Sequence, residues 1–199
     1  ARVGCALFGS LGATGIGHGT PDAVVAGLRG LSPETCDPAA VRSAWSDYPV
    51  GAPLVIAGAH EVAFTKEDID FAPRTRLPGH PNAMTLTAWA SDGEAVVEET
   101  YYSVGGGFIR REGEEAALTT SGFPYSYADA ASLLALCDEH GLSIAEVARL
   151  NETSVRSEEE VAAGLDAIWD AMAACVGTGL QSDGVLPGML KVKRRASVI

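Results

Sequence analysis

The sequence predicts an α+β fold in which a first half that mixes strands and helices precedes a helical second half. Before residue 124, several short segments alternate apolar and polar residues with a period of two, and after it the period changes to about 3.6. Three pairs of residues in the second half have the spacing that caps helix N-termini. We therefore expect two domains, residues 1–124 with an antiparallel sheet and residues 125–199 with helices alone.

The composition is that of a globular chain with an acidic surface. Of 199 residues, 47% are hydrophobic and 20% are charged, which excludes a disordered chain. The formal net charge of −12 repels phosphate backbones, so we expect no nucleic-acid partner. Because no run of 18 apolar residues and no signal peptide are seen, we also expect no membrane partner and a cytoplasmic location.

The first elements are an apolar strand, a glycine-rich loop and a helix. Residues 2–8 read as the strand, and glycine occupies five of the eleven positions from 9 to 19. A helix is expected over residues 20–31, because Thr20 can cap its first amides and Pro21 fits its first turn.

The rest of the first half predicts further strands and a tight hairpin. We expect a short helix over residues 39–46, a strand over 54–64, a polar loop over 65–83 and a strand over 84–90. Asp92-Gly93 predicts a hairpin turn, because both central residues of such a turn need a positive φ. The returning strand, 95–104, leads into a second glycine-rich stretch at 105–107.

Three capping boxes predict helices over residues 126–179. The boxes pair Ser126 with Asp129, Ser143 with Glu146, and Ser157 with Glu160. The third helix has an apolar stripe at helical spacing, which we expect to be buried. Its members are Val161, Leu165, Ile168, Trp169, Met172, Cys175 and Val176.

The four cysteines do not form a metal site by their spacing. Cys5, Cys36, Cys137 and Cys175 contain no C-x-x-C pair. We expect reduced thiols that are mostly buried, with Cys36 the one that could be exposed because its neighbours are polar. We therefore predict no metal ligands in this chain.

The glycine-rich loop is the first candidate binding site, because free amides before a helix attract anions. A P-loop would need lysine where His18 stands, and a dinucleotide fingerprint starting at Gly15 breaks at Thr20. A smaller anion site remains, suited to a carboxylate, with Thr14, His18 and Thr20 as donors. His18 could equally act as a base, and the pattern leaves the two roles open.

Other polar motifs have simpler readings. His60 and His140 occur in ordinary strand and helix-end contexts, and Asn151-Glu152 can be the polar end of a helix. The stretch 194–197, Arg-Arg-Ala-Ser, has the pattern of a basophilic kinase site but also that of an exposed basic tail. No hydrolase or metalloprotease motif occurs.

Five segments taken in order give a resemblance to a known family. They are Gly-Ser-Leu-Gly-Ala-Thr-Gly-Ile-Gly-His-Gly-Thr at 9–20, Leu-Pro-Gly-His-Pro-Asn-Ala-Met at 77–84, Thr-Tyr-Tyr-Ser-Val-Gly-Gly-Gly-Phe at 100–108, Asn-Glu at 151–152, and Gly-Val-Leu-Pro-Gly at 184–188 with the Arg-Arg-Ala-Ser stretch. Together they cover nearly the whole chain. The chain resembles the bacterial iron-sulfur L-serine dehydratases.

The resemblance implies a lyase that converts L-serine to pyruvate and ammonia with a 4Fe-4S cluster and without pyridoxal phosphate. It implies a partial β domain over residues 1–124, similar to the allosteric substrate-binding domain of phosphoglycerate dehydrogenase, and the start of the catalytic α domain over 125–199. None of the four cysteines matches a cluster ligand of the family. The cluster would therefore be held by the rest of the catalytic domain, in cis or as a separate subunit, and this chain alone is expected to be inactive.

Position by position, the resemblance implies a catalytic His18 and a substrate site for L-serine at Ser10, Thr14 and Gly15. His80 and Asn82 also lie in a family-like stretch. A homodimer is left open. The alternative hypotheses are an amino-acid-sensing or regulatory domain without catalysis, and a purely structural or dimerising domain.

Overall fold

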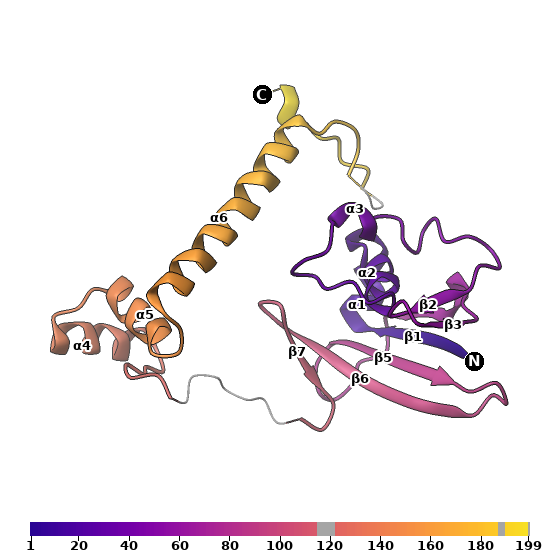
Figure 1. Ribbon diagram of the computed structural model, residues 1–199, viewed down its shortest axis with the longest axis horizontal. Coiled ribbons are helices and arrows are strands. Elements are labelled where there is room, and N and C mark those ends of the chain that lie inside the picture. Colours follow the sequence, from indigo (N-terminus) through magenta and orange to yellow (C-terminus); the bar gives the residue numbers. More distant parts are fainter. Residues whose placement is uncertain (115–121, 187–189, 199) are drawn as a thin grey trace. The chain divides into compact units, whose positions relative to one another are not determined.

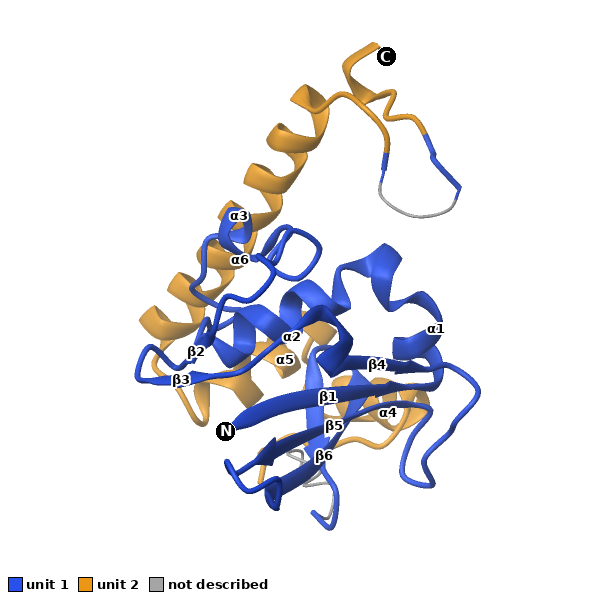
Figure 2. Cartoon of the chain, turned by 90° about the vertical axis from the view of Figure 1, so that its right-hand side faces the viewer, with its two compact units in different colours: residues 1–115, 186–192 blue, residues 116–185, 193–199 orange. Residues whose placement is uncertain are grey.

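A computed structural model describes residues 1–114, 122–186 and 190–198. The chain divides into two compact units (Figure 2), one of residues 1–115 with 186–192 and one of residues 116–185 with 193–199. The division precedes the expected boundary at 124. The assignment of the halves to a β and an α domain stays a prediction, and each unit is described by itself.

Unit 1 contains a five-stranded mixed sheet, which confirms the α+β class. Its strands are β1 (Arg2–Phe8), β4 (Ile69–Ala72), β5 (Asn82–Trp89), β6 (Ala95–Gly105) and β7 (Phe108–Arg111), in the order β4-β1-β5-β6-β7. The pair β1–β4 is parallel and the other neighbours are antiparallel, so the expectation of a purely antiparallel sheet is wrong. Strand β4 lies inside the stretch predicted as loop, and four residues are too few to show a period.

The stretch predicted as a glycine-rich loop is a helix. Helix α1 (Gly9–His18) follows β1 directly, and α2 (Thr20–Leu28) lies with it on one face of the sheet (Figure 1). The glycines allow close packing rather than an irregular backbone. A Cβ at Gly12 would lie 2.6 Å from the carbonyl oxygen of Leu7, so the helix rests on the end of β1 where a side chain would collide.

Helix α2 is shorter than predicted and begins differently. Its N-cap is Gly19, with a φ of +70°, and Thr20 makes no capping hydrogen bond through its side chain, which corrects its predicted role. Pro21 stands in the first turn as expected, and the helix ends at Leu28. The helix expected over 39–46 is a single turn, α3 (Pro38–Val41).

The segment 54–64 is a small hairpin rather than one strand. Strands β2 (Leu54–Ile56) and β3 (His60–Val62) pair antiparallel as a separate sheet, and a 3₁₀ turn, η1 (Lys66–Asp68), leads into β4. The reversal between them has Ala57 and Gly58 at positive φ. The apolar pattern of the two strands continues through this turn, so the sequence pattern did not reveal the turn.

The core of unit 1 lies between the sheet and the helices. The alternation in β1 directs Val3, Cys5 and Leu7 to the helical side, where all three are buried. The other buried members of this core are Val25, Ala44, Tyr48, Leu54, Phe64 and Ile69. Each fully buried aliphatic or aromatic side chain stabilises the fold by about 1.5–3 kcal/mol, and the same packing holds α1 in place.

Unit 2 is helical as predicted, with α4 (Ala130–His140), α5 (Ile144–Thr153), α6 (Glu158–Gln181) and a 3₁₀ turn, η2 (Ala196–Val198). The capping boxes that begin at Ser143 and Ser157 are confirmed. The predicted pair of Ser126 with Asp129 is wrong. Asp129 is itself the N-cap of α4 and forms its box with Ser132, since an aspartate accepts the N3 amide as well as a serine does.

The apolar stripe of α6 is not a core. Leu165 and Trp169 are 63% and 67% exposed, and none of the described residues of α6 is buried, so the expected burial of the stripe is wrong. Cys175 is exposed with it, whereas Cys5 and Cys137 are buried and Cys36 is intermediate. Periodicity identified the apolar face, but it cannot say whether another element covers that face.

Helix α6 is long and apolar enough to cross a bilayer by length and composition alone, with a mean hydropathy of 1.2 over an 18-residue window. The sequence predicted no membrane span, and α6 is the one helix among the described residues that passes this test of length and composition. Core helices of soluble proteins pass the same test. Asp166 and Asp170 lie within the helix, and each would cost about 2.5–3.5 kcal/mol at a bilayer centre.

The burial of the thiols predicts their order of alkylation. Burial raises the pKa of Cys5 to about 12, so at pH 8 about one molecule in ten thousand carries the reactive thiolate. We expect iodoacetamide to modify Cys175 first and Cys5 last, as read by peptide mass spectrometry over time. Fast labelling of Cys5 in the folded chain would contradict the buried position of β1.

Alanine substitutions at two helical glycines should change the stability of the fold in opposite directions. Gly12→Ala places a Cβ against Leu7 and should lower the free energy of unfolding by about 1–3 kcal/mol. Gly27→Ala, the matched control, meets nothing within 4 Å and should raise it by about 0.5–1 kcal/mol through helix propensity. Urea denaturation measures both, and equal effects would contradict the close contact of α1 with β1.

Candidate functional site

Three of the segments that carry the family resemblance meet at one end of the sheet. The cross-strand register joins Phe8 to Ala83, Ala83 to Tyr102, and Tyr102 to Arg110. One residue beyond this row, Gly9 of α1 forms an isolated bridge with Asn82. The sheet therefore brings the start of α1, the segment 77–82 and strands β6 and β7 together, although up to 100 positions separate them in the sequence.

The predicted residues Ser10, Thr14 and His18 lie along one exposed face of α1. The Thr14 hydroxyl donates to the carbonyl oxygen of Ser10 at 2.9 Å, and His18 Nδ1 lies 2.9 Å from the carbonyl oxygen of Thr14. Because a carbonyl oxygen only accepts, His18 Nδ1 must carry a proton. Neutral His18 therefore presents the lone pair of Nε2 outward.

These contacts change what the face offers to a ligand. The donors of Thr14 and of neutral His18 are used within the helix, which leaves the Thr14 hydroxyl oxygen and His18 Nε2 outward as acceptors beside the hydroxyl of Ser10. The role of Thr14 in substrate binding stays a prediction. The face suits a group that gives a proton, such as an ammonium or an acidic C–H.

The predicted site residues are spread along the length of α1. With a rise of about 1.5 Å per residue, Ser10 and His18 are about 12 Å apart along the helix axis. The side chain of His18 leans back over Thr14, whereas Ser10 lies beside the segment that carries His80. Ser10 therefore lies near the segment 77–82 and His18 nearer the C-terminal end of α1, and the assignment of both to one serine site stays a prediction.

Gly15 and Thr20 lie on the inner side of this arrangement. Gly15 is buried, and a Cβ there would approach the Cβ of Thr20 to 3.2 Å, so the two residues mark the contact of α1 with α2. The start of α2 already has a negative group, because Asp22 lies in its first turn and accepts from the amides of Trp45 and Ser46. The predicted role of Gly15 in substrate binding stays a prediction.

The segment 77–82 packs on α1 and on β6 through backbone contacts. A Cβ at Gly9, whose φ is +51°, would lie 2.1 Å from the carbonyl oxygen of Pro81, and a Cβ at Gly79 would lie 2.5 Å from Tyr102. Only glycine fits at either contact. His80 Nδ1 accepts the amide proton of Asn82 at 3.1 Å, so neutral His80 carries its proton on Nε2.

Sequence reasoning missed Tyr102 and Arg110 as members of this region. Tyr102 is 2% exposed, and Arg110 donates through Nη2 to the carbonyl oxygen of Gly79 at 2.9 Å. Tyr102 lay within a family-like stretch, but its contact with Gly79 depends on register. The arginine had no signal, because β7 is too short for its pattern to be read.

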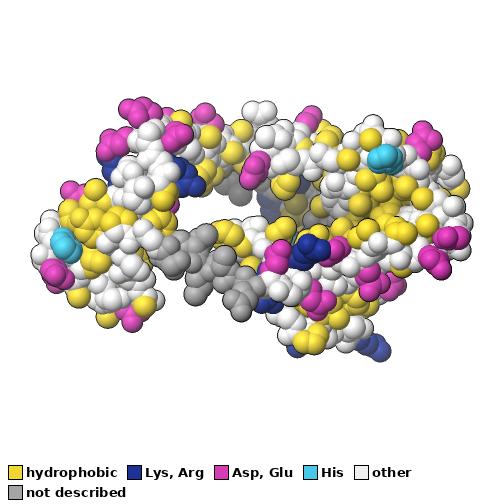
Figure 3. Space-filling view, turned by 60° about the horizontal axis from the view of Figure 1, so that its bottom comes forward, with side chains coloured by type: hydrophobic (Ala, Val, Ile, Leu, Met, Phe, Trp, Pro, Cys, Tyr) yellow, Lys and Arg dark blue, Asp and Glu magenta, His cyan; other side chains and the backbone are white. Residues whose placement is uncertain are grey.

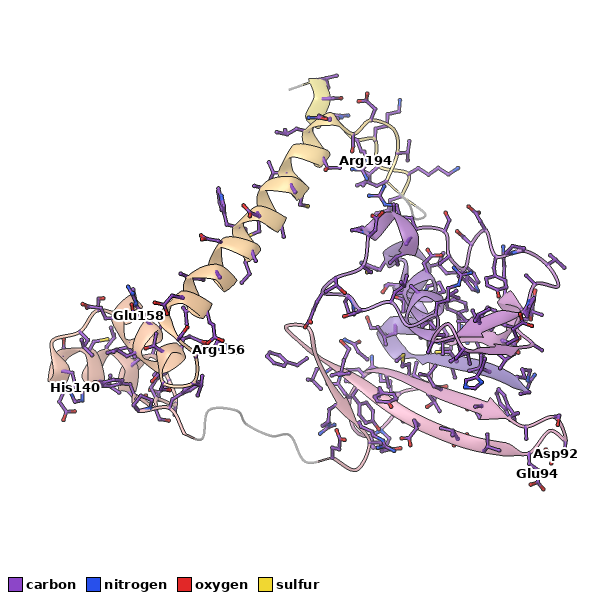
Figure 4. All side chains as sticks on the ribbon, in the orientation of Figure 1. Asp92, Glu94, His140, Arg156, Glu158 and Arg194 are labelled. Carbon is purple, nitrogen blue, oxygen red and sulfur yellow. The ribbon has the colours of Figure 1, made fainter. Side chains whose placement is uncertain are left out.

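Unit 2 has a cavity of about 190 Å³ between the segment that precedes α4 and the second half of α5. It is lined by Phe123, Tyr125, Ser126, Tyr127, Ala148, Asn151 and Glu152. The buried Asn151 holds the backbone of Tyr125 with two hydrogen bonds, of 2.9 and 3.0 Å, and Glu152 pairs with Arg156. His140, at the end of α4 (Figure 4), packs edge-on against Tyr125. These contacts support the structural reading of Asn151 and His140.

The charged side chains in the view of Figure 3 are mostly acidic, as expected for a chain with 26 acidic and 14 basic residues. The tip of the β5–β6 hairpin carries Asp92 and Glu94 (Figure 4), and Asp92 accepts the amide of Glu94 at 3.0 Å. Among the described residues, no group of three His, Cys, Asp or Glu side chains could hold a metal ion. Unit 1 contains only Cys5 and Cys36 and unit 2 only Cys137 and Cys175, with one cysteine of each pair buried, so neither unit has the four thiolates that a 4Fe-4S cluster needs.

Comparison with known proteins identifies the family of the chain. A family model described as the serine dehydratase beta chain matches residues 1–114, which include all three converging segments. The chain belongs to this family.

The sequence similarity to members of the serine dehydratase family covers both units of this chain. The L-serine dehydratase of Streptomyces coelicolor is 42% identical over 202 residues, covering 99% of this chain and 44% of the relative. L-serine dehydratase 1 of Escherichia coli is 39% identical over 202 residues, covering 100% and 44%. The L-serine dehydratase of Mycobacterium tuberculosis is 42% identical over 196 residues, covering 96% and 42%. The chain thus spans less than half the length of these relatives.

The two histidines predict opposite tautomers. For the neutral rings, ¹⁵N nuclear magnetic resonance should find the proton of His18 on Nδ1 and that of His80 on Nε2. Exposed His60, for which the structure gives no ring hydrogen bond, is the reference for an unconstrained ring. The same tautomer at His18 and His80 would contradict the geometry of this site.

Proposed function

We propose that this chain is part of an L-serine ammonia-lyase, which converts L-serine to pyruvate and ammonia, and that it forms one wall of the amino-acid site. The observation that carries the proposal is the convergence of α1, the segment 77–82 and the β6–β7 strands at one end of the sheet. The names of the relatives support the substrate.

The elimination removes one proton from the α-carbon and hydroxide from the β-carbon of serine. The resulting aminoacrylate rearranges to an imine, and water hydrolyses this to pyruvate and ammonia. Neutral His18 suits the first step, because its Nε2 lone pair faces outward while Nδ1–H is held by Thr14. Neutral His80 has a proton on Nε2 and could supply a donor at the other end of α1.

The resemblance to iron-sulfur enzymes implies a 4Fe-4S cluster, which would act as a Lewis acid on the serine hydroxyl. The described residues do not fit such a cluster, so its ligands would come from outside them. The proposal therefore assigns this chain binding and proton-transfer roles alone. It also assumes that the chain is inactive without the rest of the catalytic domain.

Three finer expectations belong to this proposal. Unit 1 would share the fold of the allosteric substrate-binding domain of phosphoglycerate dehydrogenase, unit 2 would begin the catalytic domain, and the enzyme would be cytoplasmic. The partly helical unit 1 and the wholly helical unit 2 are compatible with the first two.

A sensing or regulatory role, with binding of L-serine but no catalysis, is the alternative. A sensor would bind L-serine in the 199-residue chain without any turnover by the complete protein. Calorimetry of L-serine against the chain, beside an anaerobic pyruvate assay of the complete protein, separates the two functions.

The variant His18→Ala tests the proposed chemistry in the complete protein after anaerobic reconstitution of iron and sulfide. Loss of a general base should lower kcat for L-serine about 100-fold or more. His60→Ala, on the exposed strand β3, is the matched control and should keep the parent rate. Equal rates for the two variants would remove His18 from the site, and no pyruvate from a protein with an intact cluster would overturn the proposed function.

A further inference from the structure

We propose that Arg110 is a positioning residue that, together with Tyr102, fixes the segment 77–82 and with it the His80 imidazole beside the start of α1. This inference rests on the proposed function, because it assumes that the segment lines the serine site. We call the three contacts of Arg110, Tyr102 and Gly79 the Arg110 clamp.

The first part of the clamp is the pair of contacts that hold Gly79 in place. Arg110 Nη2 donates to the Gly79 carbonyl oxygen at 2.9 Å, and its Cζ lies 5.1 Å from the centre of the Tyr102 ring. Gly79 packs against the same ring, because a Cβ on it would lie 2.5 Å from the ring atom Cζ. The loop backbone is therefore held by both a hydrogen bond and an aromatic surface.

The second part is the fixation of the tyrosine itself. Tyr102 lies between Ala83 and Arg110 in the register of the sheet, and its hydroxyl donates to Glu112 Oε1 at 2.8 Å. The amide of Glu112 donates in turn to the carbonyl oxygen of Thr100 at 2.8 Å. The ring under Gly79 is thus anchored at both ends, by strand pairing and by its hydroxyl.

The third part is the connection to α1. His80 follows Gly79 directly, and its Nδ1 accepts the amide proton of Asn82, which bridges to Gly9. A displacement of Gly79 would therefore rotate the His80 imidazole. It would also disturb the bridge between Asn82 and Gly9 at the start of α1. Residues that align a reacting group in this way act on the rate more than on the binding of the substrate.

An unpaired donor distinguishes the clamp from an ordinary stabilising contact. Arg110 Nε is buried and has no hydrogen-bond partner, the one such side-chain atom found in the described part of the chain. A buried unpaired donor costs about 1–3 kcal/mol. The neighbouring Arg111, on the other face of β7, uses both Nε and Nη2 on the carboxylate of Glu99. Arg110 therefore holds its place at a cost to stability that Arg111 does not have.

The test compares Arg110→Met with Arg111→Met in the complete reconstituted protein. Methionine keeps the apolar stem over Tyr102 and removes the unpaired donor, so the unfolding temperature of Arg110→Met should be unchanged or higher. Its kcat for L-serine should fall about tenfold or more while KM stays within about twofold, and Arg110→Lys, which can still donate to Gly79, should recover part of kcat. Arg111→Met should keep the parent kcat.

Equal kcat values for Arg110→Met and Arg111→Met would overturn the inference. If Arg110→Met fails to fold, Tyr102→Phe, which removes the hydroxyl that bonds Glu112, replaces it under the same criterion. Nuclear magnetic resonance of the His80 ring in the 199-residue chain is an independent reading: its signals should shift in Arg110→Met and not in Arg111→Met. That reading remains decisive for the clamp even if the parent protein does not deaminate serine, which would reject the proposed function alone.

Discussion

The structure of unit 1 depends on close contacts between backbones that leave no room for a side chain. Helix α1 rests on the end of β1 at Gly12, and its first residue, Gly9, lies against the carbonyl of Pro81. A third contact of this kind holds Gly79 on the ring of Tyr102. Because these contacts involve rigid groups, small changes at any of them propagate to the others. The convergence of the three segments follows from this packing.

The glycine-rich stretch therefore has a different meaning from the one that its composition suggests. Glycines before a helix often expose amides to a phosphate or carboxylate. Here they lie inside a helix, and the polar groups that face outward from it are the side chains of Ser10, Thr14 and His18. With the Thr14 hydroxyl and the His18 ring proton bonded along the helix, this face presents two acceptors, the Thr14 oxygen and His18 Nε2, beside the hydroxyl of Ser10. An acceptor of this kind is what the proposed removal of an α-proton needs.

The sequence predicted those features that depend on local pattern. The alternation in β1, the chain reversal at Asp92-Gly93 and two of the three capping boxes are set by neighbouring residues, and they are confirmed, although Gly93 takes a positive φ and Asp92 does not. The strand β4, the role of Tyr102 and the exposure of the α6 stripe depend on pairing and on covering elements, which no local period contains. The family resemblance is confirmed by the match over residues 1–114, whereas the roles of the individual site residues stay predictions.

We propose that L-serine binds against the exposed face of α1, beside the segment 77–82. Hydrogen–deuterium exchange of the complete protein, measured with and without saturating L-serine, is the direct test. L-serine should slow exchange in peptides covering residues 9–18 and 77–82 together, with little change at the cavity in unit 2. Protection confined to residues 123–152, or none in either segment of unit 1, would contradict it.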